Sequence, residues 1–153
     1  MKGALPVVIL VLGMLFVVYH NLSQQHAAPS YSSFTISNKT FAITYVAANE
    51  SSWRTGLMNK TITNSTTMLF VFPNLGIYPF WMFDTYSNLD MIWINGSLTS
   101  GKIVYIAANA TSCFNENSCT IYNPNRFANF VIEAKEGFVK RNNVSLGQMV
   151  FFR

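Results

Sequence analysis

Short runs of apolar residues, separated by turn-forming residues, constrain the fold of this chain more than any other feature of its sequence. In residues 41–46 (FAITYV) large apolar side chains alternate with smaller groups, which is typical of a half-buried strand. Residues 68–72 (MLFVF) are continuously apolar and end at Pro73-Asn74, which favours a strand buried on both faces. Further runs of this kind occupy residues 80–83, 89–94, 102–107, 127–134 and 148–152.

About seven strands at short spacing are typical of an all-β barrel or sandwich. Asn95-Gly96 favours a hairpin between residues 89–94 and 102–107, bulged or wide because the loop is longer than two residues. Helical patterns are limited to residues 50–58, capped by Asn49, and residues 135–142. We therefore predict a small single-domain all-β barrel or sandwich with one or two short helices.

An apolar segment precedes this domain. Residues 3–19 (GALPVVILVLGMLFVVY) carry no charge and follow Lys2, and a bilayer-spanning helix needs roughly 17–25 such residues. The alternative is a cleaved secretory signal, but its one candidate site, His26-Ala27-Ala28, has a bulky His where a small residue is needed. The positive charge at the start places the N-terminus in the cytoplasm and the remainder outside.

Three segments follow from this interpretation. Residues 1–22 are predicted to form a signal anchor, a membrane anchor helix that contacts the membrane through residues 3–19. Residues 23–33 are polar and are predicted to form a stalk, and residues 34–153 are predicted to form an extracytoplasmic β-domain. The predicted location is the cell membrane, as a single-pass protein, or the exterior as a secreted protein if the signal is cleaved.

The chain as a whole is poor in charge. Only 10% of the residues are charged, against about 25% in average domains, and Lys and Arg are scattered singly, so no nucleic-acid partner is expected. The motif Asn-x-Ser/Thr occurs eight times where chance would give roughly three. It begins at Asn21, Asn38, Asn49, Asn59, Asn64, Asn95, Asn109 and Asn143. We expect a densely N-glycosylated surface; the alternative is a polar surface with unused motifs.

The two cysteines lie close together in a polar stretch. Cys113 and Cys119 flank the sequence FNENS, and an exported chain meets an oxidising compartment, so a disulfide is expected. A metal site is not expected, because two thiolates need further Cys or His ligands and the predicted domain offers none.

Most catalytic systems are excluded by an absence. Both histidines, His20 and His26, precede the predicted domain, which removes Ser-His-Asp, Cys-His and His-based acid–base chemistry. No glycine-rich phosphate-binding motif is present, and no cofactor is expected. Asp84 and Asp90 are weak catalytic candidates, as a pair of carboxylates suited to glycoside hydrolysis. The structural alternative is that Asp84 serves a turn and that Asp90 is buried and paired, with Arg54 or Arg126 as its partner.

The aromatic run Phe80-Trp81-Met82-Phe83 has two interpretations. Aromatic residues at the mouth of a barrel form ligand platforms, and more often such residues belong to the core.

The order and spacing of several motifs resemble the family called domain of unknown function 192 (uncharacterised protein family 0127), over residues 34–152. The motifs are Gly56-Leu57-Met58, Met68 to Phe72, Phe80-Trp81-Met82, Thr85, Leu89-Asp90, Cys113, Cys119, Tyr122, Val131 to Ala134, Gly137-Phe138 and Gly147. The resemblance implies a compact all-β fold, often exported or membrane-anchored, and implies no activity. Matching polar residues make Arg54, Thr85, Asp90 and Glu133, with Trp81, the candidate ligand-binding residues.

This copy departs from the family pattern around those motifs. The stretch after Trp81-Met82 reads Phe83-Asp84-Thr85 instead of Lys-Asn-Thr, and Thr67 replaces a Gly. The Arg that follows Gly-Leu-Met in the family is replaced by Asn59-Lys60. If this polar cluster forms a site, the site is altered in this chain.

Three functions fit these observations. The leading hypothesis is a surface-anchored, glycosylated β-domain that binds a ligand or a protein partner without catalysis. The alternatives are a small carboxylate-dependent hydrolase using Asp84 and Asp90, and a structural subunit of a cell-surface assembly.

Overall fold

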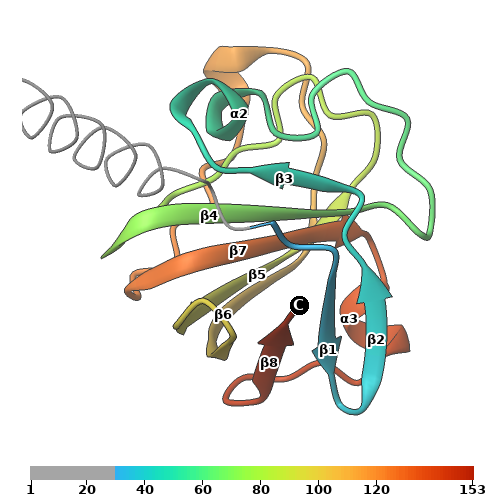
Figure 1. The fold of residues 1–153 in the computed structure, drawn as a ribbon. Helices are drawn as coiled ribbons and strands as arrows, with labels where there is room; N and C mark the ends of the chain where they lie inside the picture. Colours follow the sequence, from blue (N-terminus) through green and yellow to red (C-terminus); the bar gives the residue numbers. More distant parts are fainter. Residues whose placement is uncertain (1–29) are drawn as a thin grey trace, which may run out of the picture.

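The computed structural model describes residues 30–153, which form one curled sheet of eight strands with two short α-helices (Figure 1). The strands are β1 (Ser33–Ile36), β2 (Lys39–Ala42), β3 (Tyr45–Ala47), β4 (Thr67–Gly76), β5 (Leu89–Gly96), β6 (Ser100–Ala110), β7 (Ala128–Lys135) and β8 (Met149–Phe152). Their order in the sheet is β2-β1-β8-β6-β5-β7-β4-β3. Neighbours are antiparallel, except that β3 runs parallel to β4. The fold is mostly β, as predicted, and takes the form of a half-barrel.

The curl of the sheet arises because one bent stretch, residues 39–47, supplies both of its edges. β2 and β3 lie at opposite ends of the strand order, yet only Ile43 and Thr44 separate them. The Thr44 amide donates to the Thr67 carbonyl at 3.0 Å, which ties the bend to β4. The strand predicted at residues 41–46 is therefore two strands, and the two ends of the sheet are drawn toward each other.

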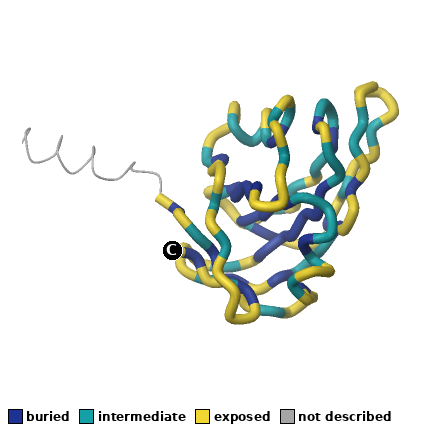
Figure 2. Tube along the Cα trace, turned by 90° about the vertical axis from the view of Figure 1, so that its right-hand side faces the viewer, coloured by how far each residue is buried: buried dark blue, intermediate teal, exposed yellow. Residues whose placement is uncertain are grey.

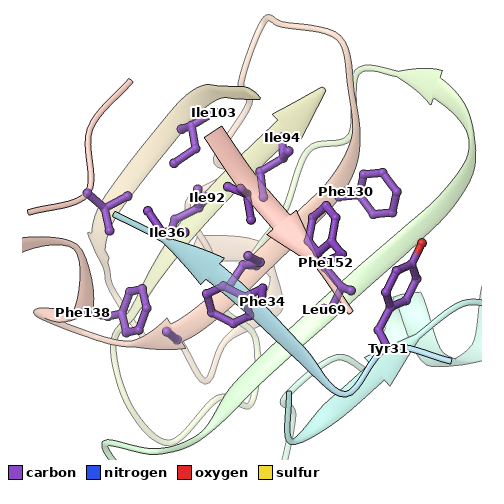
Figure 3. Close-up of a cluster of buried hydrophobic side chains, with 14 residues drawn as sticks. Tyr31, Phe34, Ile36, Leu69, Ile92, Ile94, Ile103, Phe130, Phe138 and Phe152 are labelled. Atoms are coloured by element: carbon purple, nitrogen blue, oxygen red, sulfur yellow. The ribbon is translucent and has the colours of Figure 1, made fainter. Parts of the chain in front are cut away.

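The core has two parts, one on each face of the central strands β4, β5 and β7. One cluster lies inside the curl (Figure 3) and consists of Tyr31, Phe34, Ile36, Leu69, Ile92, Ile94, Ile103, Phe130, Ile132, Ala134, Phe138, Val144, Val150 and Phe152. The other lies on the opposite face and consists of Ala47, Leu57, Met68, Phe70, Phe72, Met82, Leu89, Met91, Trp93, Ala107, Ala110, Ala128 and Val131. Buried residues accordingly run along the middle strands, and exposed residues follow the turns (Figure 2). The prediction that residues 68–72 form a strand buried on both faces is confirmed.

The other strands agree with the sequence in most places. β5 to β8 confirm the predicted runs, and the β5–β6 hairpin carries two register shifts, so it is bulged as expected. β1 was not expected. Tyr31 and Ser33, assigned to the stalk by composition, belong to the folded domain, since Tyr31 is buried and Ser33 begins β1.

The helices are shorter than their sequence patterns. α2 spans Glu50–Thr55 and is capped by Asn49, whose side chain accepts a hydrogen bond from the Ser52 amide at 3.0 Å. It ends at Gly56 because the backbone there turns to φ 47°, a conformation outside the helix. α3 spans Phe138–Arg141 and packs against β1 and β2 through the Phe138 ring.

The predicted anchor (residues 1–22), most of the predicted stalk and the sequon at Asn21 lie outside the described residues. Within residues 30–153, no helix has the length and apolar character needed to cross a membrane.

Candidate functional site

A pocket of about 530 Å³ opens on the face of the sheet that carries the second core cluster. α2 and the segment near residue 116, drawn in orange, lie together above this face in Figure 1. The lining residues come from five separate stretches of the chain, and seven of them are aromatic: Trp53, Phe70, Phe72, Tyr78, Phe80, Trp81 and Phe83. The pocket therefore has largely apolar, aromatic walls.

One wall is formed by α2 and the residues that follow it. Trp53 is fixed in orientation because its indole N–H donates to the carbonyls of Ala47 and Val71, at 3.0 and 3.1 Å. Arg54 and Glu50, one helical turn apart, form an ion pair of 2.7 Å, and no other ion pair occurs within residues 30–153. Both side chains line the pocket entrance and remain exposed to solvent.

The opposite wall is formed by residues 78–85. The sequence predicted a strand at residues 80–83, but this segment makes only isolated bridges, Phe80 with Tyr122 and Phe83 with Cys113. A regular strand does not form because Pro79 lacks an amide donor and Asp84 has φ 49°, so the chain turns at both ends. The aromatic side chains are thereby held beside the pocket instead of within the sheet.

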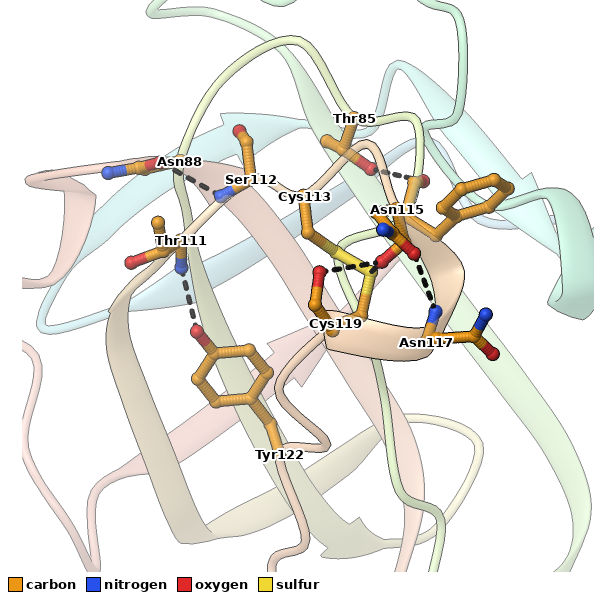
Figure 4. The surroundings of a disulfide bond; sticks show 11 residues. Thr85, Asn88, Thr111, Ser112, Cys113, Asn115, Asn117, Cys119 and Tyr122 are labelled. Atoms are coloured by element: carbon orange, nitrogen blue, oxygen red, sulfur yellow. Dashed lines mark hydrogen bonds between the residues drawn. A yellow bond between two sulfur atoms is a disulfide. The ribbon is translucent and has the colours of Figure 1, made fainter.

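The disulfide loop supports this wall. Cys113 and Cys119 are bonded, with their Cα atoms 5.5 Å apart, and the 3₁₀ helix η1 (Glu116–Ser118) lies between them (Figure 4). The amide of Asp84 donates to the Cys113 carbonyl at 2.9 Å. Glu116 is carried to the pocket by this loop.

The inner end of the pocket holds a buried carboxyl group. Glu133 lies on the central strand β7, opposite Met68 of β4 and Met91 of β5, and its exposed fraction is 4%. No described residue pairs with this carboxyl, and burial alone raises its pKa from 4.5 to about 8. Glu133 is therefore mostly protonated at neutral pH, and its polar atoms face the pocket without a partner.

The structure brings together four of the five candidate ligand-binding residues. Arg54, Trp81, Thr85 and Glu133 all line the pocket. Thr85 is buried, and its hydroxyl donates to the Phe83 carbonyl at 3.2 Å, so its oxygen remains free to accept a hydrogen bond.

Asp90, the fifth candidate, lies elsewhere. Its Oδ1 accepts from the Asn109 amide at 2.8 Å and its Oδ2 accepts from the Val139 amide at 2.7 Å. The partners of the buried Asp90 carboxylate are therefore backbone amides, and not Arg54 or Arg126 as the sequence suggested. The fold brings the N–H groups of residues 109 and 139 to the buried end of β5. Asp84 lies in a turn within the segment of residues 78–85 and is half-buried, and neither carboxylate is among the pocket-lining residues.

Several pocket residues were not found from the sequence. Glu50 and Trp53 lie in a helix whose pattern predicted only a cap and two turns, and Glu116 lies in a polar loop. Tyr78, Phe70 and Phe72 resemble ordinary core residues. Three of the six acidic residues of the chain line this pocket. They lie far apart in the sequence, so their grouping becomes visible only in the folded structure. Within residues 30–153 no group of three His, Cys, Asp or Glu side chains is placed to hold a metal ion.

Two solved structures share this fold. One is a putative transcription regulator from Sinorhizobium meliloti 1021, with TM-score 0.66, 28% identity, and coverage of 82% of this chain and 98% of that chain. The other is a protein of unknown function from Novosphingobium aromaticivorans DSM 12444, with TM-score 0.65 and 21% identity, covering 82% of this chain and 93% of that one. No curated protein matches the sequence. The family model DUF192, described as "Uncharacterized ACR", matches residues 32–152, which cover the whole half-barrel. This chain therefore belongs to the DUF192 family.

Proposed function

We propose that this chain is a binding module that takes a small ligand into the pocket between α2 and residues 78–85, without catalysing a reaction on it. The observation that carries the proposal is the pocket itself, with aromatic walls and one unpartnered carboxyl at its inner end. Small-molecule sites are typically concave and mostly apolar, with a few polar groups that orient the ligand. A volume of about 530 Å³ suits a ligand of this size.

The non-catalytic part of the proposal is supported by the chemistry of the described residues. Residues 30–153 contain no His, and both oxygens of Asp90 are already held by backbone amides. Glu133 is the one buried acidic residue at the pocket, and a pair of carboxylates is needed for glycoside hydrolysis.

We further propose that the module lies outside the cell, tethered by an anchor at residues 1–22 and carrying N-linked glycans. All seven sequon asparagines within residues 30–153 are exposed, and none lines the pocket. The side chains of Asn49, Asn59 and Asn109 form hydrogen bonds within the protein, and in each case the Oδ1 atom accepts. The Nδ2 atom, which would carry a glycan, is left available. The disulfide is consistent with an oxidising compartment.

The three tryptophans of the chain provide a direct test of ligand binding. Trp53 and Trp81 line the pocket, whereas Trp93 is fully buried on β5 and its indole N–H donates to the Tyr78 carbonyl at 2.9 Å. The full chain, kept soluble in a nonionic detergent and labelled with ¹⁵N, is titrated with a panel of small aromatic and aliphatic fragments. We expect fragments to shift the indole signals of Trp53 and Trp81 and to leave that of Trp93 nearly unchanged. A panel in which no fragment moves the Trp53 or Trp81 signal overturns the binding proposal.

The cellular setting is tested separately on protein purified from its native source. Intact-mass and glycopeptide analysis is expected to find the N-terminal segment retained and glycans on the exposed sequons. A mature chain that begins after residue 28 and carries no glycan would contradict this setting.

A further inference from the structure

The chemistry of the pocket indicates the charge of its ligand. The β-sheet places Glu133 at a position where none of residues 30–153 forms a hydrogen bond with its carboxyl. It faces Met68 and Met91 across the neighbouring strands, and Gly56 contributes no side chain above it. A buried polar group without a partner carries a free-energy cost. A ligand that offers a donor or a positive charge at this point removes that cost.

The walls around this carboxyl are suited to a cation on an apolar body. Seven aromatic rings line the pocket, and several are held rigidly by their neighbours, as in the stacked pair Phe72 and Tyr78, whose ring centroids lie 3.7 Å apart. The negative face of an aromatic ring attracts a cation within about 6 Å of its centre, and the attraction grows when water is excluded. Aromatic rings also pack against an apolar ligand body.

The charge at the pocket opposes that of the whole chain. The net charge of the chain is +4, yet three of its six acidic residues, Glu50, Glu116 and Glu133, line this pocket. Of the Lys and Arg residues that the structure describes, Arg54 alone lines it, and Glu50 neutralises Arg54 at 2.7 Å. An anionic ligand would meet no free positive charge here, because Arg54 is paired with Glu50, whereas a cation could pair with the carboxyl of Glu133 once that group loses its proton.

We propose that the pocket binds an organic cation, an ammonium group attached to an aromatic or other apolar body, with the ammonium at Glu133 and the body between the aromatic walls. This inference rests on the proposed binding function and adds the chemical class of the ligand. The ammonium N–H groups donate to the Glu133 carboxylate and so supply the partner that no described residue provides.

Cation binding is coupled to proton release. Burial raises the pKa of Glu133 to about 8, so at pH 7 the free pocket holds a neutral carboxyl, and an ammonium that pairs with the carboxylate displaces this proton. The other titratable or charged groups that line the pocket are Glu50 and Arg54 on α2, Tyr78 on the aromatic wall, and Glu116 on the disulfide loop. β4 and β5 face Glu133 with Met68 and Met91, which do not titrate.

Three probes with one aromatic body and different charges test the proposal: 2-phenylethylammonium, 2-phenylethanol and 3-phenylpropionate. Binding to the full chain is measured by calorimetry in buffers of different ionisation enthalpy. We expect the ammonium to bind most tightly and the carboxylate most weakly. We also expect the release of about one proton per ammonium bound at pH 7, and an affinity that rises about tenfold per pH unit below pH 8. The binding of 2-phenylethanol is expected to change little with pH.

The variant Glu133→Gln keeps the shape of the side chain and removes its titration. It is expected to lower the affinity for the ammonium by about tenfold or more and to abolish proton release, with the affinity for 2-phenylethanol nearly unchanged. The matched control Glu116→Gln removes an exposed carboxylate at the same pocket and is expected to keep proton release.

The outcomes separate the two proposals. If 2-phenylethanol or 3-phenylpropionate binds as tightly as the ammonium, or if the ammonium binds without proton release, the cation proposal fails and the binding function stands. If none of the three probes binds while fragments shift Trp53 and Trp81, the cation proposal fails alone. If neither probes nor fragments bind, both proposals fail. These outcomes do not depend on the folding of any variant.

Discussion

The Oε2 atom of Glu133 lies 3.9 Å from the position that a Cβ atom on Gly56 would occupy, so the glycine leaves the inner end of the pocket open. The same Cβ would lie 3.3 Å from the Phe70 ring. Gly56 also has φ 47°, which side chains rarely adopt. The residue therefore ends α2 and gives access to the carboxyl at the same time.

Gly56→Ala is expected to lower both the stability and the ligand affinity of the protein. The positive φ costs about 1–3 kcal/mol of the free energy of unfolding, and the added methyl group narrows the approach to Glu133. Urea denaturation measures the first effect and fragment titration the second. Gly147→Ala is a matched control, because Gly147 also has a positive φ, 84°, but is exposed. A Cβ atom added there would contact only the Lys102 side chain, which does not line the pocket. That variant should lose stability and keep fragment binding, and equal losses of binding in both would contradict this interpretation.

The stability of the protein is expected to fall as the pH rises from about 5 to about 8. The pKa of Glu133 is about 8 in the folded state and 4.5 in its unperturbed state, so in this interval the folded chain binds more protons than the unfolded chain. The free energy of unfolding contributed by Glu133 is fully present below the unfolded pKa. It decreases by up to about 1.4 kcal/mol per pH unit and levels off above pH 8.

The contribution of Glu133 is isolated by comparing urea denaturation of the wild type with that of Glu133→Gln across this range. The difference between the two free energies should carry the slope, since other titrating groups are shared. Glu116→Gln, on the exposed disulfide loop, should retain the slope of the wild type. A constant difference between wild type and Glu133→Gln from pH 5 to pH 8 is the result that would contradict the raised pKa.

Asp90→Asn is expected to lower stability and to leave fragment binding unchanged. Both carboxylate oxygens accept backbone hydrogen bonds, and an amide nitrogen in place of either oxygen cannot accept one. The loss is about 1–3 kcal/mol, measured by urea denaturation. Asp84→Asn is the matched control, because Asp84 is half-buried at φ 49°, a conformation that Asn tolerates well, and its stability should change little. Unchanged stability in Asp90→Asn would remove the structural role assigned to this residue.

Loss of the disulfide is expected to weaken the protein without unfolding it. Closing a loop of this length contributes about 2 kcal/mol in the chain-entropy model, and Phe80 and Tyr122 still hold the loop through two backbone hydrogen bonds of 3.0 and 2.8 Å. The double substitution Cys113→Ser with Cys119→Ser should lower the free energy of unfolding by that amount. Fragment binding should weaken as well, since Glu116 and the aromatic wall lose their support. Ser118→Ala, inside the loop, should have a smaller effect, and an unchanged stability of the double variant would contradict the expectation.

Regular apolar patterns were enough to locate five of the eight strands. β4 to β8 were predictable because alternation and continuous apolar runs report which faces of a strand are buried, and because Pro73 and Asn95-Gly96 mark chain reversals. The disulfide was predictable from the spacing of Cys113 and Cys119 in a chain expected to be exported. The resemblance to the DUF192 family singled out Arg54, Trp81, Thr85 and Glu133, without indicating what they do together.

Where those residues meet depends on contacts between distant parts of the chain, which no local pattern reports. The division of residues 41–46 into two strands depends on the hydrogen bond between Thr44 and Thr67, which are far apart in the sequence. The position of residues 80–83 outside the sheet depends on pairing with Cys113 and Tyr122, which lie about 30 to 40 residues further along the chain. Whether a buried carboxyl has a partner depends on long-range neighbours: Asp90 accepts from two backbone amides, and Glu133 accepts from none within residues 30–153. A local pattern reports burial, but it does not report the donors that folding brings to a buried group, and these donors determine the chemistry of the site.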